Sequence, residues 1–77
     1  MLRRFMSRGA AIGVLVNGRR REVEDGSSVE SLLDSLAAPK DRLAVEVNGR
    51  VVPRQARSAT RLRDGDRIEI VTFVGGG

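Results

Sequence analysis

Residues 27–39 read SSVESLLDSLAAP and predict one amphipathic helix. Ser27 and Glu30 have the spacing of a capping box, in which each side chain satisfies a free backbone amide of the first turn. Apolar residues recur at positions i, i+3, i+4 and i+7, which predicts one buried stripe made of Val29, Leu32, Leu33 and Leu36. Pro39 is expected to end the helix, because proline disfavours helical geometry in the residue before it.

A hairpin precedes this helix. Alternating apolar residues predict its first strand, at Ile12, Val14 and Val16. Asn17-Gly18 then predicts a type I′ turn, which needs a positive φ at both central positions. Residues 19–24 return as a largely solvated strand, and Asp25-Gly26 ends the hairpin.

A second strand pair follows the helix. Residues 43–47 are typical of a strand, and the Asn-Gly dipeptide at 48–49 predicts another type I′ turn. Residues 50–52 return, and Pro53 ends them because its nitrogen cannot donate to a strand ladder. The stretch 54–61 is polar and irregular.

The last strand is expected over residues 67–74, after a tight turn at 64–66. Successive side chains of a strand point to opposite faces of the sheet. One face of this strand therefore carries Ile68 and Ile70, and the other carries Glu69, Val71 and Phe73.

These elements predict an α+β fold in which one helix covers one face of a mixed four- or five-stranded sheet. Linking the first strand to a parallel neighbour through the helix would need a right-handed crossover. The β-grasp architecture has this arrangement, with the first and last strands adjacent at the sheet centre. The expected core packs the helix against the sheet through Leu32, Leu33, Leu36, Val14, Val16, Val45, Ile68 and Ile70. The pattern alone leaves a ferredoxin-like variant open.

The composition excludes several function classes. The 77 residues include no cysteine and no histidine, which excludes zinc fingers, thiol redox centres and Cys–His nucleophiles. No apolar run approaches the ~18 residues of a membrane span, so we expect a cytoplasmic protein with no membrane partner.

The positive charge is concentrated at the start of the chain. Residues 1–11 contain three arginines and no acid, and we expect a disordered basic tail ahead of a domain over 12–74. Without that tail, 11 basic residues face 10 acidic ones. Phe5 and Phe73 are the only aromatic residues, so platforms for stacking bases are missing and nucleic acid is not an expected partner.

The sequence ends in Gly75-Gly76-Gly77. Glycine at a chain end frays easily, which is the structural explanation. The functional explanation is that a tail without Cβ atoms threads a narrow channel in another enzyme and presents its terminal carboxylate to ATP. The glycine run alone does not separate these interpretations.

The neighbouring segments resemble the bacterial sulfur carrier proteins of thiazole (thiamin) biosynthesis, the ThiS family. They are the closing segment 69–77 (EIVTFVGGG), the strand–turn–strand segment 44–54 (AVEVNGRVVPR), and the turn at 64–66 followed by Ile68. The resemblance covers residues 12–77. One departure from the family pattern is Gly75, a third glycine before the usual pair.

The resemblance implies a ubiquitin-like β-grasp that is a protein co-substrate rather than an enzyme and binds no cofactor itself. Gly77 would be adenylated by an ATP-dependent activating enzyme and converted to a thiocarboxylate with sulfur from a cysteine-desulfurase-derived persulfide. Thiazole synthase would then receive the sulfur. Gly75 and Gly76 would complete the flexible tail, residues 75–77.

Apolar side chains beside the tail are the expected docking surface for these enzymes, namely Val71, Phe73 and Val74. The alternative is that loop 53–61 folds over them. Other functions also stay open: the small subunit of molybdopterin synthase, a ubiquitin-like protein modifier, or a non-catalytic β-grasp binding module in which the glycine tail is incidental.

Overall fold

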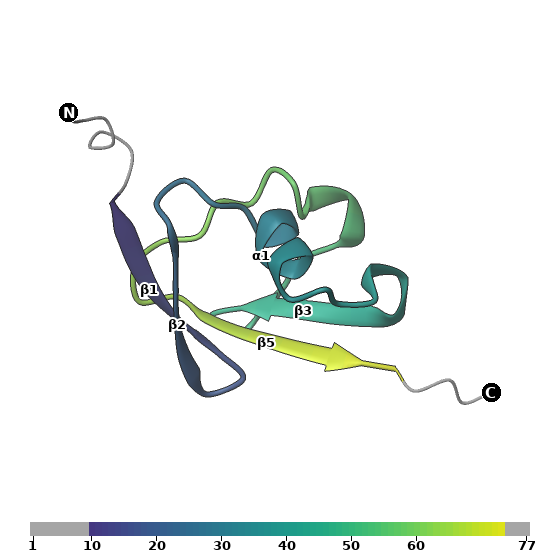
Figure 1. Ribbon diagram of the computed structural model, residues 1–77. Helices are drawn as coiled ribbons and strands as arrows, with labels where there is room; N and C mark the ends of the chain where they lie inside the picture. Colours follow the sequence, from purple (N-terminus) through teal and green to yellow (C-terminus); the bar gives the residue numbers. More distant parts are fainter. Residues whose placement is uncertain (1–9, 74–77) are drawn as a thin grey trace.

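The computed structural model describes residues 10–73, in which one helix lies on one face of a five-stranded sheet (Figure 1). Residues 1–9 of the expected basic tail lie outside the described residues. Val74 and the glycine tail at 75–77 also lie outside them.

The first hairpin joins β1 (Ala11–Val16) to β2 (Arg19–Glu24) in antiparallel pairing. Asn17 and Gly18 have φ angles of 50° and 83°, as the predicted type I′ turn requires. The hairpin begins slightly earlier than the sequence indicates, because the Ala10 carbonyl already accepts a hydrogen bond from the Asp25 amide at 2.8 Å.

The second hairpin joins β3 (Leu43–Val47) to the two-residue strand β4 (Arg50–Val51). Its turn repeats the geometry of the first, with φ angles of 52° at Asn48 and 84° at Gly49. The polar stretch that follows is not wholly irregular, because residues Arg54–Ala56 form a 3-10 helix.

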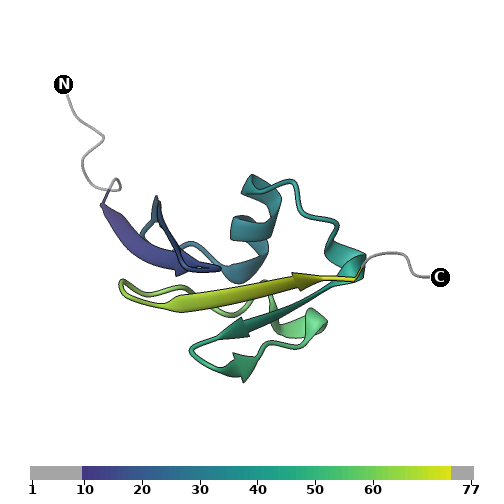
Figure 2. The same cartoon turned by 90° about the horizontal axis from the view of Figure 1, so that it is seen from below.

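Strand β5 (Arg67–Thr72) lies at the centre of the sheet, whose strand order is β2-β1-β5-β3-β4 (Figure 2). It runs parallel to β1 and antiparallel to β3. Adjacent first and last strands at the sheet centre confirm the ubiquitin-like β-grasp and exclude the ferredoxin-like variant. The strand itself ends at Thr72, two residues before the predicted end.

Helix α1 (Val29–Ser35) begins at a different capping residue from the predicted one. Ser28 is the N-cap: its Oγ accepts a hydrogen bond from the Ser31 amide at 3.1 Å, and the Ser31 Oγ accepts one from the Ser28 amide at 2.9 Å. The predicted box of Ser27 and Glu30 is therefore wrong. Ser27 still precedes the helix, and the Glu30 carboxylate pairs with Lys40 instead.

The end of α1 also differs from the prediction, because the helix stops before Pro39 can act. Ala37 has a φ of 54°, the left-handed conformation that glycine usually supplies at this position. The Ala38 amide donates to the Leu33 carbonyl at 3.1 Å, and the Ala37 amide donates to the Asp34 carbonyl at 3.0 Å. These two bonds form a Schellman motif, which reverses the chain toward a short 3-10 helix (Lys40–Arg42).

The core lies between α1 and the sheet, as predicted, with some changes of membership. Leu36, Val16 and Ile70 are only partly buried. Leu43 and Leu62 are buried in their place. Within the described residues the buried cluster comprises Val14, Val29, Leu32, Leu33, Leu43, Val45, Leu62 and Ile68, and Val52 is buried as well. No helix within residues 10–73 is long and apolar enough to cross a membrane.

Replacing Ala37 by glycine should stabilise the fold, because glycine adopts a positive φ without the steric strain of a Cβ atom. We expect Ala37→Gly to raise the free energy of unfolding by about 0.5–1 kcal/mol in urea denaturation. The matched control is Ala59→Gly, an exposed alanine whose φ is not positive, which should lower stability slightly. Equal losses in both variants would contradict the role of the Schellman turn.

Candidate functional site

The site that the sequence predicts lies beyond β5, so the contacts that hold β5 decide where the tail begins. On one side, β1 pairs with β5 only through Leu15–Arg67 and Val16–Ile68. Where β1 ends, the Asn17 side chain continues the pairing. Its Nδ2 donates to the Ile70 carbonyl at 3.0 Å, and its Oδ1 accepts from the Ile70 amide at 2.7 Å.

On its other side, β5 pairs with β3 along the whole length of β3, from Val47–Ile68 to Leu43–Thr72. One further bond lies beyond this ladder, because the Phe73 amide donates to the Arg42 carbonyl at 2.7 Å. The strand is therefore held by backbone hydrogen bonds up to Phe73, the last described residue. The segment that leads to the tail consequently starts from a fixed position.

The segment that receives the Phe73 amide is itself anchored by an ion-pair cluster. The Lys40 Nζ lies 2.5 Å from the Asp34 Oδ1 and 2.8 Å from the Glu30 Oε2, both on α1. Hydrogen bonds to Asp34 and then to Glu30 raise the pKa of Lys40 above its ordinary value. Because this cluster is accessible to solvent, it orients the segment more than it stabilises the fold.

Arg57 is a second anchor of the same segment, and the sequence analysis missed it. Its side chain is buried, with only 4% exposed. The guanidinium donates to the carbonyls of Lys40 at 2.8 Å and Leu43 at 3.0 Å. Within the described residues its Nε has no partner. Nothing in the sequence distinguishes this arginine from its exposed neighbours, because its burial depends on a distant segment.

The predicted docking residues Val71 and Phe73 lie on the face of the sheet opposite α1, and each is 58% exposed. Residues 53–61 do not cover them. This loop lies on the helix side (Figure 1), where the carbonyls of Arg57 and Thr60 accept hydrogen bonds from the first amides of α1. The exposure of Val71 and Phe73 is thereby confirmed, whereas their docking role stays a prediction.

The remaining predicted site residues, Val74, Gly75, Gly76 and Gly77, lie outside the described residues. Within residues 10–73 no three Asp or Glu side chains come together as a metal site. The geometry therefore offers a rigid strand that leads toward the glycine tail, with two exposed apolar side chains next to it.

Replacing Asn17 by glycine should loosen β5 near the tail without straining the turn, because glycine accepts the positive φ of this position. We expect Asn17→Gly to lower the free energy of unfolding by about 1–2 kcal/mol through two lost hydrogen bonds. Amide hydrogen exchange should become faster at Ile70.

Asn48→Gly is the matched control. Asn48 lies in the same kind of turn, but its side chain accepts a hydrogen bond from the Arg67 amide at 2.9 Å. It should speed exchange at Arg67 and leave Ile70 protected. The same exchange pattern in both variants would show that the turns, and not the two side chains, control the ends of β5.

Comparison with known proteins shows to which family the chain belongs. The sequence model of the ThiS family matches residues 14–77. A crystal structure of a thiamine biosynthesis protein (ThiS) from Geobacter metallireducens superposes with a TM-score of 0.75 at 38% identity, covering 86% of this chain and 100% of that one.

Two kinds of curated relatives also match. A thiazole synthase of Paramagnetospirillum magneticum is 38% identical over 64 residues, which cover 83% of this chain and 20% of the relative. The chain thus spans about a fifth of that relative. An uncharacterised protein, ycf40 of Porphyra purpurea, is 33% identical over 66 residues, covering 86% of this chain and 93% of the relative. The family model and the superposed structure agree with the fold described above. The chain therefore belongs to the ThiS family, the small sulfur carrier proteins of thiamine biosynthesis.

Proposed function

We propose that this protein carries sulfur on the carboxyl group of Gly77 for thiazole formation. An ATP-dependent activating enzyme adenylates this carboxyl group with release of pyrophosphate. The outer sulfur of a cysteine-desulfurase-derived persulfide then attacks the acyl carbon and displaces AMP, which leaves an acyl disulfide. A thiol from outside this chain reduces that disulfide to the thiocarboxylate and is itself oxidised to a disulfide. Membership of the ThiS family supports the proposal. The observation that carries it in the structure is the central strand β5, which is held by backbone bonds up to Phe73 and leads toward Gly75, Gly76 and Gly77.

The proposed chemistry requires no catalytic side chain in the carrier itself. A carboxylate is a poor electrophile, and joining it to AMP supplies a leaving group that lets a sulfur nucleophile attack the acyl carbon. ATP and the general acids and bases belong to the activating enzyme. The carrier contributes a tail that reaches the reaction centre and a surface by which the enzyme recognises it, which agrees with a chain that has neither histidine nor cysteine.

Thiazole synthase is the proposed acceptor of the sulfur. Relatives named thiazole synthase from two organisms match this chain over only 20% and 19% of their own lengths. A carrier-like segment within the same chain as the enzyme raises its effective concentration at the enzyme. We infer that the present chain delivers its sulfur to the same kind of enzyme in the cytoplasm.

Thiocarboxylate formation provides the direct test. The full chain is incubated with ATP, an activating enzyme, a persulfide donor and a thiol reductant, and its intact mass is measured. We expect a gain equal to the exchange of one oxygen for sulfur, because the acyl-adenylate is converted by sulfur attack. Deleting Gly77 should abolish this gain.

The control for the assay is a known carrier treated with the same activating enzyme. If that carrier gains sulfur and this chain does not, the proposal is wrong. Adding thiazole synthase or molybdopterin synthase then separates the two pathways by product. A binding module would keep its partner after deletion of Gly77, and a protein modifier would form conjugates with lysines.

The exposed face of β5 is the proposed docking surface for the activating enzyme. A carboxylate at Val71 would have to be desolvated on binding, so we expect Val71→Asp to raise the KM for the carrier about tenfold or more. The matched control is Val51→Asp, since Val51 is 66% exposed but lies on β4, at the edge of the sheet. Equal effects of the two variants would refute docking through β5.

A further inference from the structure

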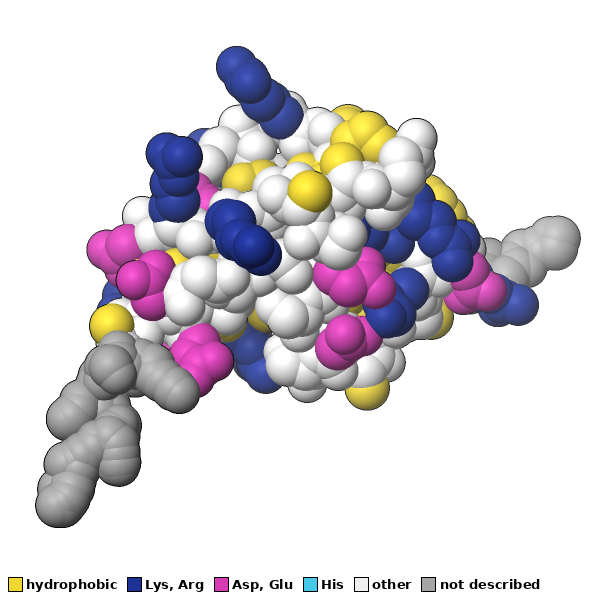
Figure 3. Space-filling model, turned by 90° about the horizontal axis from the view of Figure 1, so that it is seen from above, with side chains coloured by type: hydrophobic (Ala, Val, Ile, Leu, Met, Phe, Trp, Pro, Cys, Tyr) yellow, Lys and Arg dark blue, Asp and Glu magenta, His cyan; other side chains and the backbone are white. Residues whose placement is uncertain are grey.

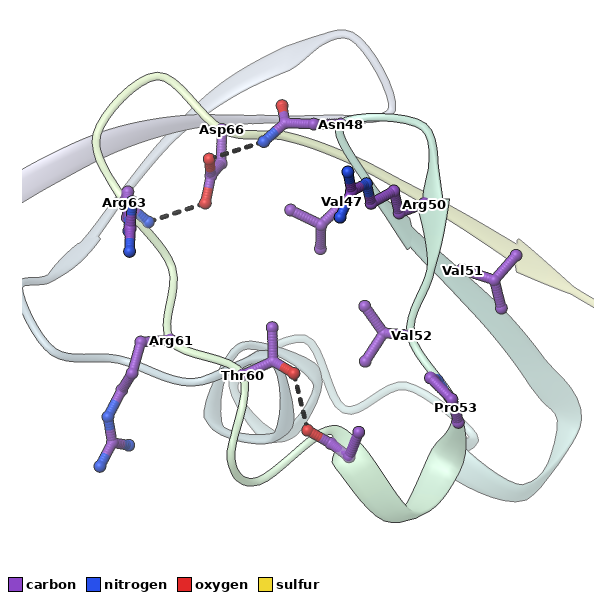
Figure 4. Close-up of a pocket in the computed structure, with 11 residues that line it drawn as sticks. Val47, Asn48, Arg50, Val51, Val52, Pro53, Thr60, Arg61, Arg63 and Asp66 are labelled. Carbon is purple, nitrogen blue, oxygen red and sulfur yellow. Dashed lines mark hydrogen bonds between the residues drawn. The ribbon is translucent and has the colours of Figure 1, made fainter.

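A hollow lies on the helix-bearing side of the sheet, away from the last residues of β5. One wall of the hollow is formed by β4 and Pro53, and the other by the segment 60–66, which we term the strap (Figure 4). Its volume is about 670 Å³, which is within the size range of ligand sites. Val47 and Val52 point into it, and Arg50, Arg61 and Arg63 stand around it. These five residues define what we term the arginine groove.

The arginine groove lies at the far end of the sheet from the tail. Val47 ends β3 next to the groove, whereas Leu43 begins β3 beside Thr72, from which the tail continues. Four residue steps along a strand separate these two ends by about 13 Å. A molecule bound in the groove therefore lies at the other end of β3 from Thr72.

The charge around the groove is mostly positive, because three arginines and one acidic residue, Asp66, line it. Residues 50–63 contain five arginines and no acid. The ion pairs within residues 10–73 involve Lys40 alone. Figure 3 shows basic side chains standing out along the β4 edge of the helix-bearing face.

Asp66 is the acidic residue that lines the groove, and neutral donors occupy both of its oxygens. One accepts from the Asn48 side chain at 2.9 Å, and the other accepts from the Arg63 backbone amide at 2.8 Å. Asp66 therefore shapes the strap without forming an ion pair with the three guanidinium groups. These groups remain available for an external anion.

The shape and the chemistry of the groove favour a peptide over a small ion or a nucleic acid. The apolar floor of Val47 and Val52 gains nothing from an inorganic anion but can bury an aliphatic side chain. Within residues 10–73 the one aromatic side chain is Phe73, at the opposite end of the sheet, so no platform for stacking bases lines the groove. Guanidinium groups around an apolar floor match carboxylates that flank a leucine-like residue.

We propose that the arginine groove binds an acidic segment of a partner protein, with an aliphatic side chain on the floor and carboxylates on Arg50, Arg61 and Arg63. This binding is independent of the sulfur chemistry at Gly77. It takes place while the tail is free or engaged elsewhere.

The test titrates the full, 15N-labelled chain with an acetylated and amidated peptide, Glu-Asp-Leu-Glu-Asp, without ATP or sulfur donor. We expect saturable NMR shifts at the amides of Val47, Arg50 and Val52. The shifts should weaken strongly when glycine replaces the leucine of the peptide or amides replace its carboxylates. No saturable shift at millimolar peptide would overturn the proposal.

Two double variants with the same change in charge separate the groove from general attraction. Arg61→Gln with Arg63→Gln should weaken peptide binding about tenfold or more, because it removes two charged contacts. Arg19→Gln with Arg21→Gln, on the far edge strand β2, should leave binding nearly unchanged. Equal weakening in both variants would mean that the peptide senses only net charge, and would overturn the proposal.

Two competing occupants complete the test. A single-stranded RNA oligonucleotide that saturates the same amides more tightly than the peptide would overturn the choice of a protein partner. The chain's own acidic stretch, residues 22–25, lies on the opposite edge of the sheet. If sedimentation shows self-association that Glu22→Gln with Glu24→Gln abolishes, the groove serves a second copy of this chain, and the proposal is equally wrong.

Discussion

The rest of this fold depends on the parallel pairing of β1 with β5, because this pairing determines the face of the sheet over which the connecting chain passes. Its regular part is only two residue pairs long, Leu15–Arg67 and Val16–Ile68. Side chains extend it at both ends: the Asp64 Oδ1 accepts from the Gly13 amide at 2.8 Å, and Asn17 binds both backbone groups of Ile70. Since parallel neighbours require a crossover connection, the chain between these strands must pass over one face of the sheet. The helix and the strap that follows β4 therefore share that face, and the opposite face stays open.

The shared face closes through contacts that join segments distant in sequence. The first amides of an α-helix have no partner within the helix. Here the amides of Val29 and Glu30 donate to the carbonyls of Thr60 and Arg57. The Arg57 side chain then reaches across to the segment that receives the Phe73 amide. The start of the helix and the end of the last strand are thus connected through one loop, which explains why this loop does not cover Val71 and Phe73.

Local signals were sufficient for much of the fold. Asn17-Gly18 and the other Asn-Gly pair predict their turns because few residues tolerate a positive φ, and period-2 alternation predicts the exposure of Val71 and Phe73. The helix ends were predicted wrongly for a physical reason. Two adjacent serines compete as the N-cap, and the path of the chain from β2 decides between them, whereas Ala37 adopts a conformation that its own side chain disfavours. The burial of Arg57 and the arginine groove both arise from segments that meet only in three dimensions.

The proposed carrier role involves several enzymes, and a small protein with that role benefits from keeping its contacts apart. In this fold the face opposite the helix presents apolar side chains next to the tail, and the arginine groove lies on the helix-bearing side at the other end of β3. Because the two surfaces lie on different faces of the sheet, the two proposals let a protein approach one surface before another leaves the other. Under the two proposals, exchange between partners at Gly77 proceeds while the groove remains occupied. The same separation means that substitutions in the groove should change partner binding without changing the reactivity of the carboxyl group at Gly77.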